Sequence, residues 1–395
     1  MNRRLFLRSG LAASGALLLG RRAAAQAAPP ARKIVIVGAG LAGLVAAYEL
    51  GKANFDVRIV EAQDRVGGRV HTFRSFGQGL YADAGAARIP DDHDLTHKYV
   101  KEFGLPLIPF YPDQDKFVRF RGGVYEPVDW DKFEEATQMV VGLGERRLWK
   151  KIQGGNDLLP KAFAQRLPGK ILYGSPVTRI EQSAAGVRVK FMKDGRLSEV
   201  AGDLAVCTVP FSVLSKIEMA PAFSESKMRT IEDFEYDSAS RVFVETDSRF
   251  WKDKGLNGFG FGENAAEIWD ASFGEPGTHG LIETYIRGGY SLDMTRTPEA
   301  ERAGKTVQKL TRLYPDLASR VVGGASKCWS EDPWVGGAWS HPGPAQVTAG
   351  RIPEGRVYFA GEHLSGQPSW MQGALESGLR AAKDILAVAA VIVRS

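Results

Sequence analysis

The apolar positions in the first part of the chain predict a strand–helix–strand unit. Residues 33–37 form a nearly continuous apolar run that ends at Gly38, the pattern of a buried parallel strand. Residues 44–52 show helical periodicity, and residues 56–60 form a second strand-like run. We therefore expect a βαβ unit here.

The later pattern predicts β-meanders and one long helix. Residues 170–210 and 241–290 alternate apolar and polar positions in short runs bounded by glycine. A helix is expected from Gln372 to about residue 391, with the apolar run at residues 385–393 as its buried end. No repeat or Pro/Ser-rich linker divides the chain, so the pattern favours an α/β protein with interleaved domains.

Residues 1–27 have the features of an export signal. Arg3 and Arg4 precede an apolar segment, in a pattern that resembles a twin-arginine signal. That segment, residues 9–20, is too short to span a bilayer, and residues 25–27 offer a cleavage site. A frayed N-terminal helix is the alternative. We expect export in folded form to the bacterial periplasm or beyond, without a stable membrane span.

This segment also accounts for the net charge. The 395 residues include 51 Lys+Arg and 46 Asp+Glu, for a charge of +5, but residues 1–27 contain five arginines and no acidic residue. The remainder is formally neutral, which gives no support to a nucleic-acid partner. The two cysteines, Cys207 and Cys328, are too few for a thiolate zinc site, and no histidine spacing indicates a metal; whether the cysteines pair is open.

A glycine motif in the βαβ unit predicts a dinucleotide site. Gly38, Gly40 and Gly43 fit G-x-G-x-x-G between the first strand and the helix, and Glu61 ends the next strand. The glycines allow close approach of a pyrophosphate to a helix N-terminus, and Glu61 would accept hydrogen bonds from ribose hydroxyls. A glycine-rich turn without ligand is the alternative.

Further motifs resemble the glutathione-reductase-type FAD-binding family. Glu61 begins an E-A-x-x-R-x-G-G-R run, and residues 356–362 resemble the later strand–Gly–Glu element of that family. The resemblance implies that the cofactor is held by Arg65, Gly68, Arg69, Val177, Gly361, Glu362 and Met371. There is no second glycine motif after a strand, so we expect no NAD(P)H site.

The later motifs resemble the flavin-containing amine oxidase family. They include Trp329, Gly336-Gly337-Ala338-Trp339 and Trp370-Met371-Gln372-Gly373-Ala374. No cysteine lies among them, so FAD should be non-covalent. The resemblance implies a Rossmann-like FAD-binding domain interleaved with a substrate domain of mixed β-sheet and helices. After the signal, we predict FAD-binding parts at residues 28–90, 152–230 and 336–395, and substrate-domain parts at residues 91–151 and 231–335.

Within this family, the segment around Arg88 looks like that of L-amino-acid oxidases, in which an arginine holds the substrate carboxylate. An arginine fork suits a carboxylate because two parallel hydrogen bonds fix its plane. The resemblance further implies that Tyr285 supplies a second hydrogen bond and that Trp339 and Trp370 flank the amine. The alternatives are a loop or phosphate-binding arginine, a core tyrosine and core tryptophans.

Three departures from the family qualify this interpretation. Arg241 stands where the family has a lysine that holds a water at flavin N5, which predicts weakened oxygen use. Glu283 lies two residues before Tyr285 and so faces the same side of a strand; we expect it to favour L-arginine or L-lysine, or to be a solvated edge residue. Only a short segment replaces a helical domain between Trp130 and Gly154, so the substrate funnel is shorter or completed by a second copy in a homodimer.

The function that the sequence predicts is oxidative deamination of a small-molecule L-amino acid by non-covalent FAD. Hydride leaves Cα for flavin N5, and the electrons pass to O2 or another acceptor. The alternatives are a monoamine or polyamine oxidase, an oxidative decarboxylating monooxygenase, and a non-catalytic flavin-binding protein. The accepted side chain and the oligomeric state are left open.

Overall fold

A five-stranded parallel sheet contains the predicted βαβ unit. The computed structural model describes residues 33–394 except 114–115, 122–123, 138–145 and 263–265, so the predicted signal at residues 1–27 lies outside the described residues. The sheet has the order β22 (Val357–Phe359), β13 (Leu204–Cys207), β1 (Lys33–Val37), β2 (Asp56–Val60) and β9 (Ile171–Leu172). Its strands thus come from three separate stretches of the chain, as interleaving requires.

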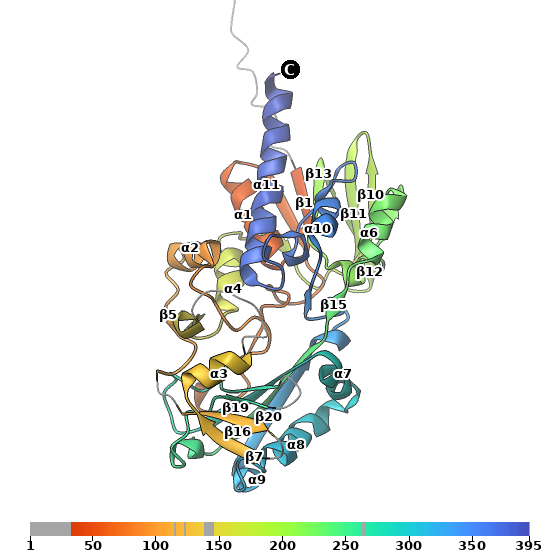
Figure 1. Cartoon of the computed structure of the whole chain (residues 1–395). Coiled ribbons are helices and arrows are strands. Elements are labelled where there is room, and N and C mark those ends of the chain that lie inside the picture. The colour runs from red at the N-terminus through yellow and green to blue at the C-terminus, as the bar shows by residue number, and fades with distance from the viewer. Residues whose placement is uncertain (1–32, 114–115, 122–123, 138–145, 263–265, 395) are drawn as a thin grey trace, which may run out of the picture. The chain divides into compact units, whose positions relative to one another are not determined.

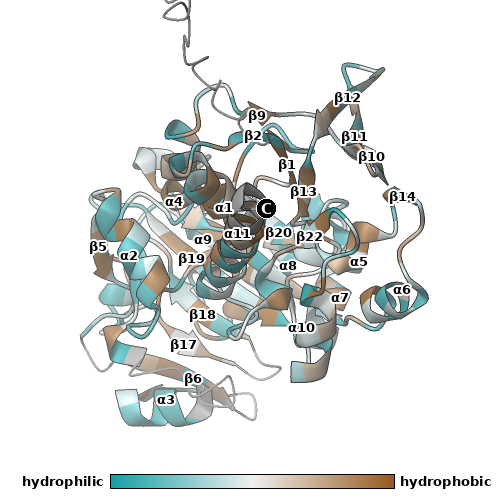
Figure 2. Ribbon diagram, turned by 90° about the horizontal axis from the view of Figure 1, so that it is seen from above, coloured by the Kyte–Doolittle hydropathy of each residue, from teal (hydrophilic) through white to brown (hydrophobic). Residues whose placement is uncertain are grey.

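Two helices pack together over this sheet. α1 (Leu41–Lys52) and α11 (Met371–Arg394) lie side by side, with apolar residues on both (Figures 1 and 2). Their contact is close because Gly378 in α11 has no side chain: a Cβ there would meet the carbonyl oxygen of Ala42 at 2.2 Å. The long C-terminal helix is confirmed, but residues 385–389 are only partly buried, since Ile385 is buried and Val388 is 41% exposed.

The first predicted meander forms a four-stranded sheet. Its order is β12 (Arg196–Gly202), β11 (Gly186–Lys193), β10 (Val177–Ser183) and β14 (Glu218–Ala220). Val187, Val189 and Phe191 are all buried on one face, as the alternation predicted.

A seven-stranded mixed sheet forms the other large layer (Figure 1). Its order is β20 (Val321–Cys328), β16 (Ala239–Thr246), β19 (Gly280–Arg287), β18 (Glu267–Asp270), β17 (Gly260–Phe261), β6 (Phe117–Arg121) and β7 (Val124–Val128). β16 and β19 are buried along nearly their whole length, which places polar side chains of these strands in the interior.

Short elements connect the layers. The paired strands are β3 (Thr72–Phe73) with β4 (Ala82–Asp83), β5 (Leu107–Pro109) with β8 (Lys150–Ile152), and β15 (Tyr236–Asp237) with β21 (Trp339–Ser340). The remaining α-helices are α2 (Asp94–Glu102), α3 (Trp130–Thr137), α4 (Leu158–Gln165), α5 (Phe211–Leu214), α6 (Glu225–Glu232), α7 (Gly288–Arg296), α8 (Glu299–Leu310), α9 (Leu317–Arg320) and α10 (Pro344–Arg351). The 3₁₀ turns are η1 (Gly77–Gly79), η3 (Arg146–Leu148), η4 (Phe250–Lys252), η5 (Trp329–Glu331) and η6 (Glu362–Leu364).

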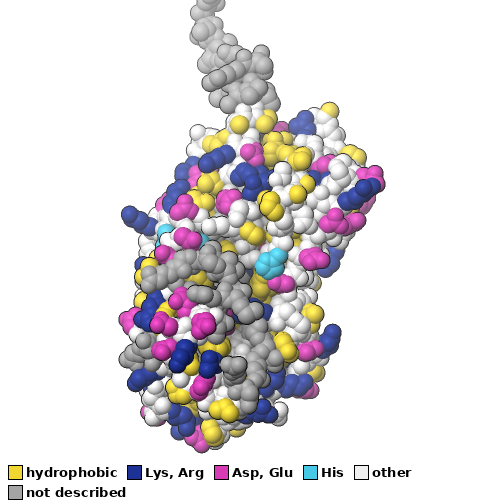
Figure 3. All heavy atoms as spheres, viewed as in Figure 1, with side chains coloured by type: hydrophobic (Ala, Val, Ile, Leu, Met, Phe, Trp, Pro, Cys, Tyr) yellow, Lys and Arg dark blue, Asp and Glu magenta, His cyan; other side chains and the backbone are white. Residues whose placement is uncertain are grey.

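Residues 32–395 form one compact unit, so the predicted domain boundaries stay a prediction. Basic and acidic side chains are interspersed on the face shown in Figure 3. Within the described part of the chain, no helix combines the length and apolarity needed to cross a bilayer.

Candidate active site

The glycines of the first motif have distinct structural tasks. Gly38 has a φ of 103°, which favours glycine, and its amide donates to the Val60 carbonyl. A Cβ at Gly43 would meet the Gly38 carbonyl oxygen at 2.1 Å, so Gly43 allows α1 to pack on the turn. A Cβ at Gly40 would instead enter open space at the cavity. The turn therefore presents bare backbone to a ligand at the N-terminus of α1.

Glu61 is fixed beside this turn. Its carboxylate accepts hydrogen bonds from the amides of Ala39 (2.6 Å) and Gln63 (2.9 Å). Burial raises the pKa of Glu61, and these amide donors oppose that shift. The carboxylate lines the cavity at the end of β2, where a ribose would be expected.

The two arginines of the second motif differ in position. Arg69 lines the cavity and pairs with Glu362 at 2.7 Å. Arg65 donates to the Gly68 carbonyl at 2.9 Å and is not among the described residues that line the cavity. Arg65 therefore braces the loop that carries Gly68 and Arg69.

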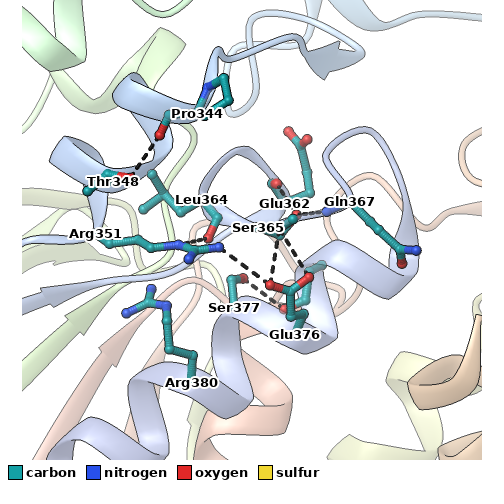
Figure 4. A network of polar contacts seen from close by, with 12 residues as sticks. Pro344, Thr348, Arg351, Glu362, Leu364, Ser365, Gln367, Glu376, Ser377 and Arg380 are labelled. Carbon is teal, nitrogen blue, oxygen red and sulfur yellow. Dashed lines mark hydrogen bonds and ion pairs between the residues drawn. The ribbon is translucent and has the colours of Figure 1, made fainter.

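A polar network holds the loop after β22 (Figure 4). Glu376 of α11 accepts from the Gly366 amide at 3.0 Å, and Arg351 of α10 donates to the Leu364 carbonyl at 2.9 Å. The Ser365 hydroxyl donates to the Glu362 carbonyl at 2.7 Å. The Gln367 side chain extends away from this network, and its buried Oε1 has no hydrogen-bond partner among the described residues.

One large cavity unites these elements with the mixed sheet. Its volume is about 1220 Å³, more than the roughly 300–1,000 Å³ of ordinary ligand pockets, which suits a dinucleotide together with a small substrate. Predicted residues on its wall are Gly38, Gly40, Glu61, Gly68, Arg69, Arg88, Val177, Arg241, Tyr285, Trp339, Gly361, Glu362, Trp370 and Met371. Gly43, Arg65 and Glu283 are not on it.

Three observations indicate that the wall fits a flavin dinucleotide. The backbone at Gly40 is open to the cavity, the Glu61 carboxylate stands beside it, and Gln367 presents an unpaired acceptor on the same wall. Cys207 and Cys328 are buried free thiols away from the wall, as expected for a cofactor that is not covalently attached.

Arg88 lies in a box of aromatic rings. Its guanidinium carbon is 5.3 Å from the Trp149 ring centroid, 4.9 Å from Trp269, 5.6 Å from Tyr285 and 5.9 Å from Trp370. The side chain is only 8% exposed, yet it lines the cavity. Burial opposes the charged form, but neighbouring Glu267 raises the pKa of Arg88 overall, so the guanidinium stays charged.

Glu267 is a site residue that the sequence did not reveal. Its carboxylate lies 3.5 Å from Arg88 and 3.3 Å from Arg287, and it accepts a hydrogen bond from the Trp269 indole at 3.0 Å. Every residue of β18 is buried, so no alternation in residues 267–270 marked the functional face. The rings of Trp149 and Trp269 were missed because buried tryptophans are usually ordinary core residues.

Arg241 and Glu283 form a buried ion pair across β16 and β19. Arg241 lies over the rings of Tyr285 (4.4 Å) and Trp269 (4.8 Å), and it lines the cavity. Burial raises the pKa of Glu283 to about 7, against the opposing effect of Arg241. The Glu283 carboxylate borders a separate void of about 20 Å³, next to Lys151. The expected exposure of Glu283 to the substrate is therefore not seen.

The two predicted cage tryptophans have different neighbours. The Trp339 ring lies 6.2 Å from Tyr285, and its indole donates to Asp237 at 2.9 Å. The Trp370 ring lies 5.7 Å from Trp149 and 5.0 Å from the buried ring of His93. Burial lowers the pKa of His93 to about 4, so this imidazole is neutral. The substrate end of the cavity is thus walled by aromatic rings around Arg88.

Comparison with known proteins agrees with these features. The family model described as flavin containing amine oxidoreductase matches residues 41–142 and 129–386. The flavin-dependent L-tryptophan oxidase RebO of Lentzea aerocolonigenes is 29% identical, over 90% of this chain and 98% of that protein. The L-amino-acid oxidase of Siganus canaliculatus is 28% identical, over 89% of this chain and 85% of that protein.

Solved structures agree on the fold. A cofactor-binding redesign of putrescine oxidase superposes with a TM-score of 0.78 at 20% identity, covering 90% of this chain and 99% of that chain. Cyclohexylamine oxidase from Brevibacterium oxydans IH-35A gives 0.78 at 19% identity with the same coverage. At this identity, the likeness concerns the fold: a Rossmann-like FAD-binding part with a mixed-sheet substrate part.

Proposed function

Because the chain belongs to the flavin-containing amine oxidoreductase family, we propose that it deaminates an L-amino acid oxidatively to the 2-oxo acid and ammonia. The family membership makes the protein a flavin-dependent oxidoreductase with non-covalent FAD. The proposal concerns the substrate class, L-α-amino acids, and it rests on the position of Arg88.

Arg88 is suited to bind a carboxylate. Its hydrogen bond to Glu267, at 3.5 Å, is at the outer limit of such contacts and is therefore weak, so the guanidinium can also bind a substrate carboxylate. Four rings surround it and exclude water, which strengthens any charge pair made there. An arginine fork in this setting orients a substrate carboxylate through two parallel hydrogen bonds.

The other residues act by positioning. The Tyr285 hydroxyl donates a hydrogen bond to the substrate carboxylate, because burial raises the pKa of this tyrosine and keeps it a neutral phenol. Trp339 and Trp370 offer ring faces to the amine, which sets the direction of the Cα–H bond. FAD, held by the turn at Gly40 and by Glu61, supplies the hydride-accepting chemistry when bound. Orientation contributes most of the rate enhancement.

The pairing of Glu283 with Arg241 gives no support to a preference for L-arginine or L-lysine. A carboxylate already neutralised by a buried arginine has little attraction left for a substrate cation. We therefore leave the side chain open and propose only the L-α-amino-acid class.

Anaerobic flavin reduction by a panel of the twenty L-amino acids tests the proposed function. Bleaching of the flavin by at least one of them, with the 2-oxo acid as product, is the expected result. Putrescine and cyclohexylamine belong in the same panel, since they lack the carboxylate. Reduction by these amines but by no amino acid would reassign the protein as an amine oxidase, and an amide product would indicate a decarboxylating monooxygenase.

We expect Arg241→Lys to speed the reaction of the reduced enzyme with O2. Arginine spreads its charge over a planar fork that is bound to Glu283, whereas lysine carries a compact charge that holds a water. Stopped-flow reoxidation of the reduced enzyme should become about tenfold faster, equal to about 1.4 kcal/mol in the barrier. Arg249→Lys makes the same change away from the cavity wall and should leave the rate unaltered. Equal reoxidation in Arg241→Lys and the unmodified enzyme would refute the role of this arginine.

A further inference from the structure

The proposed reaction needs a proton acceptor that Arg88, Tyr285 and the two tryptophans do not supply. An amino acid enters as a zwitterion with a protonated amine. Hydride leaves Cα only when the nitrogen lone pair is available to form the C=N bond. One N–H bond must therefore break first, and its proton must go to a base in or beside the cavity.

Most ionisable groups on the cavity wall cannot take this proton. Arg88, Arg241 and Arg287 are permanently charged. Glu61 is bound by backbone amides at the dinucleotide turn, and Glu362 is paired with Arg69. Among the carboxylates and imidazoles of the described residues on the wall, this leaves those of Asp237 and His341.

Asp237 and His341 are bonded to each other beside Trp339. The His341 Nε2 lies 2.6 Å from Asp237 Oδ2, and the Trp339 indole nitrogen lies 2.9 Å from the same oxygen. The antiparallel pairing of β15 with β21 sets Asp237 opposite Trp339, so the arrangement is fixed by the backbone. The pair therefore sits at the edge of a ring whose face is proposed to contact the amine.

The Trp339 indole nitrogen also lies 2.8 Å from His341 Nε2, so the indole, the imidazole and the Asp237 carboxylate form one cluster. We take Nε2 to carry a proton that it donates to Asp237 Oδ2, in which case the indole N–H donates to the same carboxylate oxygen. In the neutral imidazole, Nδ1 then has a lone pair, and it has no hydrogen-bond partner among the described residues. The Asp237 carboxylate thus fixes the orientation of the imidazole and can stabilise the imidazolium that forms when Nδ1 takes a proton.

We propose that the Asp237–His341 pair accepts the proton of the substrate ammonium, an inference that rests on the proposed function. The N–H bond of the ammonium breaks, its electron pair stays on nitrogen, and the proton passes through one water to Nδ1 of His341. The imidazolium is stabilised by Asp237, and it returns the proton to solvent because the His341 side chain is 60% exposed.

The other charged groups near the pair have partners of their own. Arg69 lies over the Tyr236 ring on β15, at 5.9 Å, and is neutralised by Glu362 of η6. Glu362 also accepts from Ser340 on β21, and burial lowers the pKa of neighbouring His363 to about 3, which keeps that ring neutral. The Lys216 ammonium donates to the Pro333 carbonyl. Of these charged groups, Asp237 is the one in direct contact with the His341 ring.

The pH dependence of flavin reduction tests this inference. With a saturating amino acid and no oxygen, His341→Gln should reduce the flavin about 100-fold more slowly at pH 7. At about pH 9.5 more of the substrate enters with a neutral amine, so the deficit should shrink to a few-fold. Asp237→Asn should show the same trend with a smaller deficit. A profile for His341→Gln that parallels the unmodified enzyme at every pH would overturn the inference.

Two further measurements separate proton transfer from structural damage. His279→Gln removes another histidine–carboxylate pair, with Glu245 at 2.9 Å, that is not on the cavity wall and should leave the profile unchanged. In His341→Gln, retention of FAD and of the near-ultraviolet spectrum should show that the fold is intact; loss of either would attribute the slower reduction to structural damage and contradict the inference. If no amino acid reduces the flavin of the unmodified enzyme, the proposed function fails instead.

Discussion

Replacing Arg88 by alanine should nearly abolish turnover of L-amino acids while the protein stays folded. The substitution removes the fork that orients the carboxylate and leaves an apolar box around the carboxylate of the substrate. An unpaired charge buried in that way is strongly unfavourable, so kcat/KM should fall about 1,000-fold, equal to about 4 kcal/mol. Anaerobic stopped-flow reduction of the flavin measures this loss directly.

A substitution that keeps the positive charge distinguishes orientation of the substrate carboxylate from simple attraction to it. Arg88→Lys keeps a cation but loses the planar fork, and we expect an intermediate loss of about 30-fold. Arg249→Lys removes a fork that binds the His279 carbonyl away from the cavity, and it should have no effect on reduction. Retention of FAD and of the near-ultraviolet spectrum controls for folding. Amino-acid turnover that survives in Arg88→Ala would exclude Arg88 as the carboxylate site.

The dinucleotide end was predictable because its chemistry is local. Gly38, Gly40 and Glu61 lie within one βαβ unit, where a buried strand and a glycine turn fix the backbone within a few residues. The structure adds the separate roles of the glycines. Gly43 allows close helix packing, whereas Gly40 leaves space open at the cavity, and the spacing of the motif alone does not distinguish these roles.

The surroundings of Arg88 were not predictable because they are assembled from distant segments. Trp149 follows η3 and Trp269 lies on β18, far from Arg88 along the chain, and nothing in either local pattern indicates a shared box. Long-range packing decides which strands become neighbours in a mixed sheet, and the periodicity of a single strand does not predict it.

Glu283 shows the limit of reasoning from strand alternation. Residues two apart on β19 do share a face, and Glu283 and Tyr285 both meet Arg241. Alternation says nothing about the strand alongside, however, and β16 brings Arg241 against the carboxylate before any substrate can reach it. The strand itself was predicted correctly, but the pairing of Glu283 with Arg241 was not, and the hypothesis about basic substrates therefore has no support.

We expect Gly40→Ala to impair FAD binding without loss of the apo fold. The Gly40 backbone has φ −70° and ψ 173°, which any residue adopts, and a Cβ there meets no protein atom within 4 Å. The methyl group would occupy the space where the pyrophosphate approaches the turn, so the FAD dissociation constant should rise about 100-fold, equal to about 2.8 kcal/mol. Fluorescence titration of the apoprotein with FAD measures the change.

Two neighbouring glycines are matched controls for this result. Gly51 lies inside α1, where a Cβ would meet no atom within 4 Å, so Gly51→Ala should raise helix stability by about 0.5–1 kcal/mol and leave FAD affinity unchanged. Gly43→Ala forces a Cβ against the Gly38 carbonyl and should destabilise even the apoprotein, by about 3 kcal/mol. If Gly40→Ala lost FAD and its apoprotein were destabilised to the same extent, Gly40 would be required for folding. That result would contradict its assignment to FAD binding.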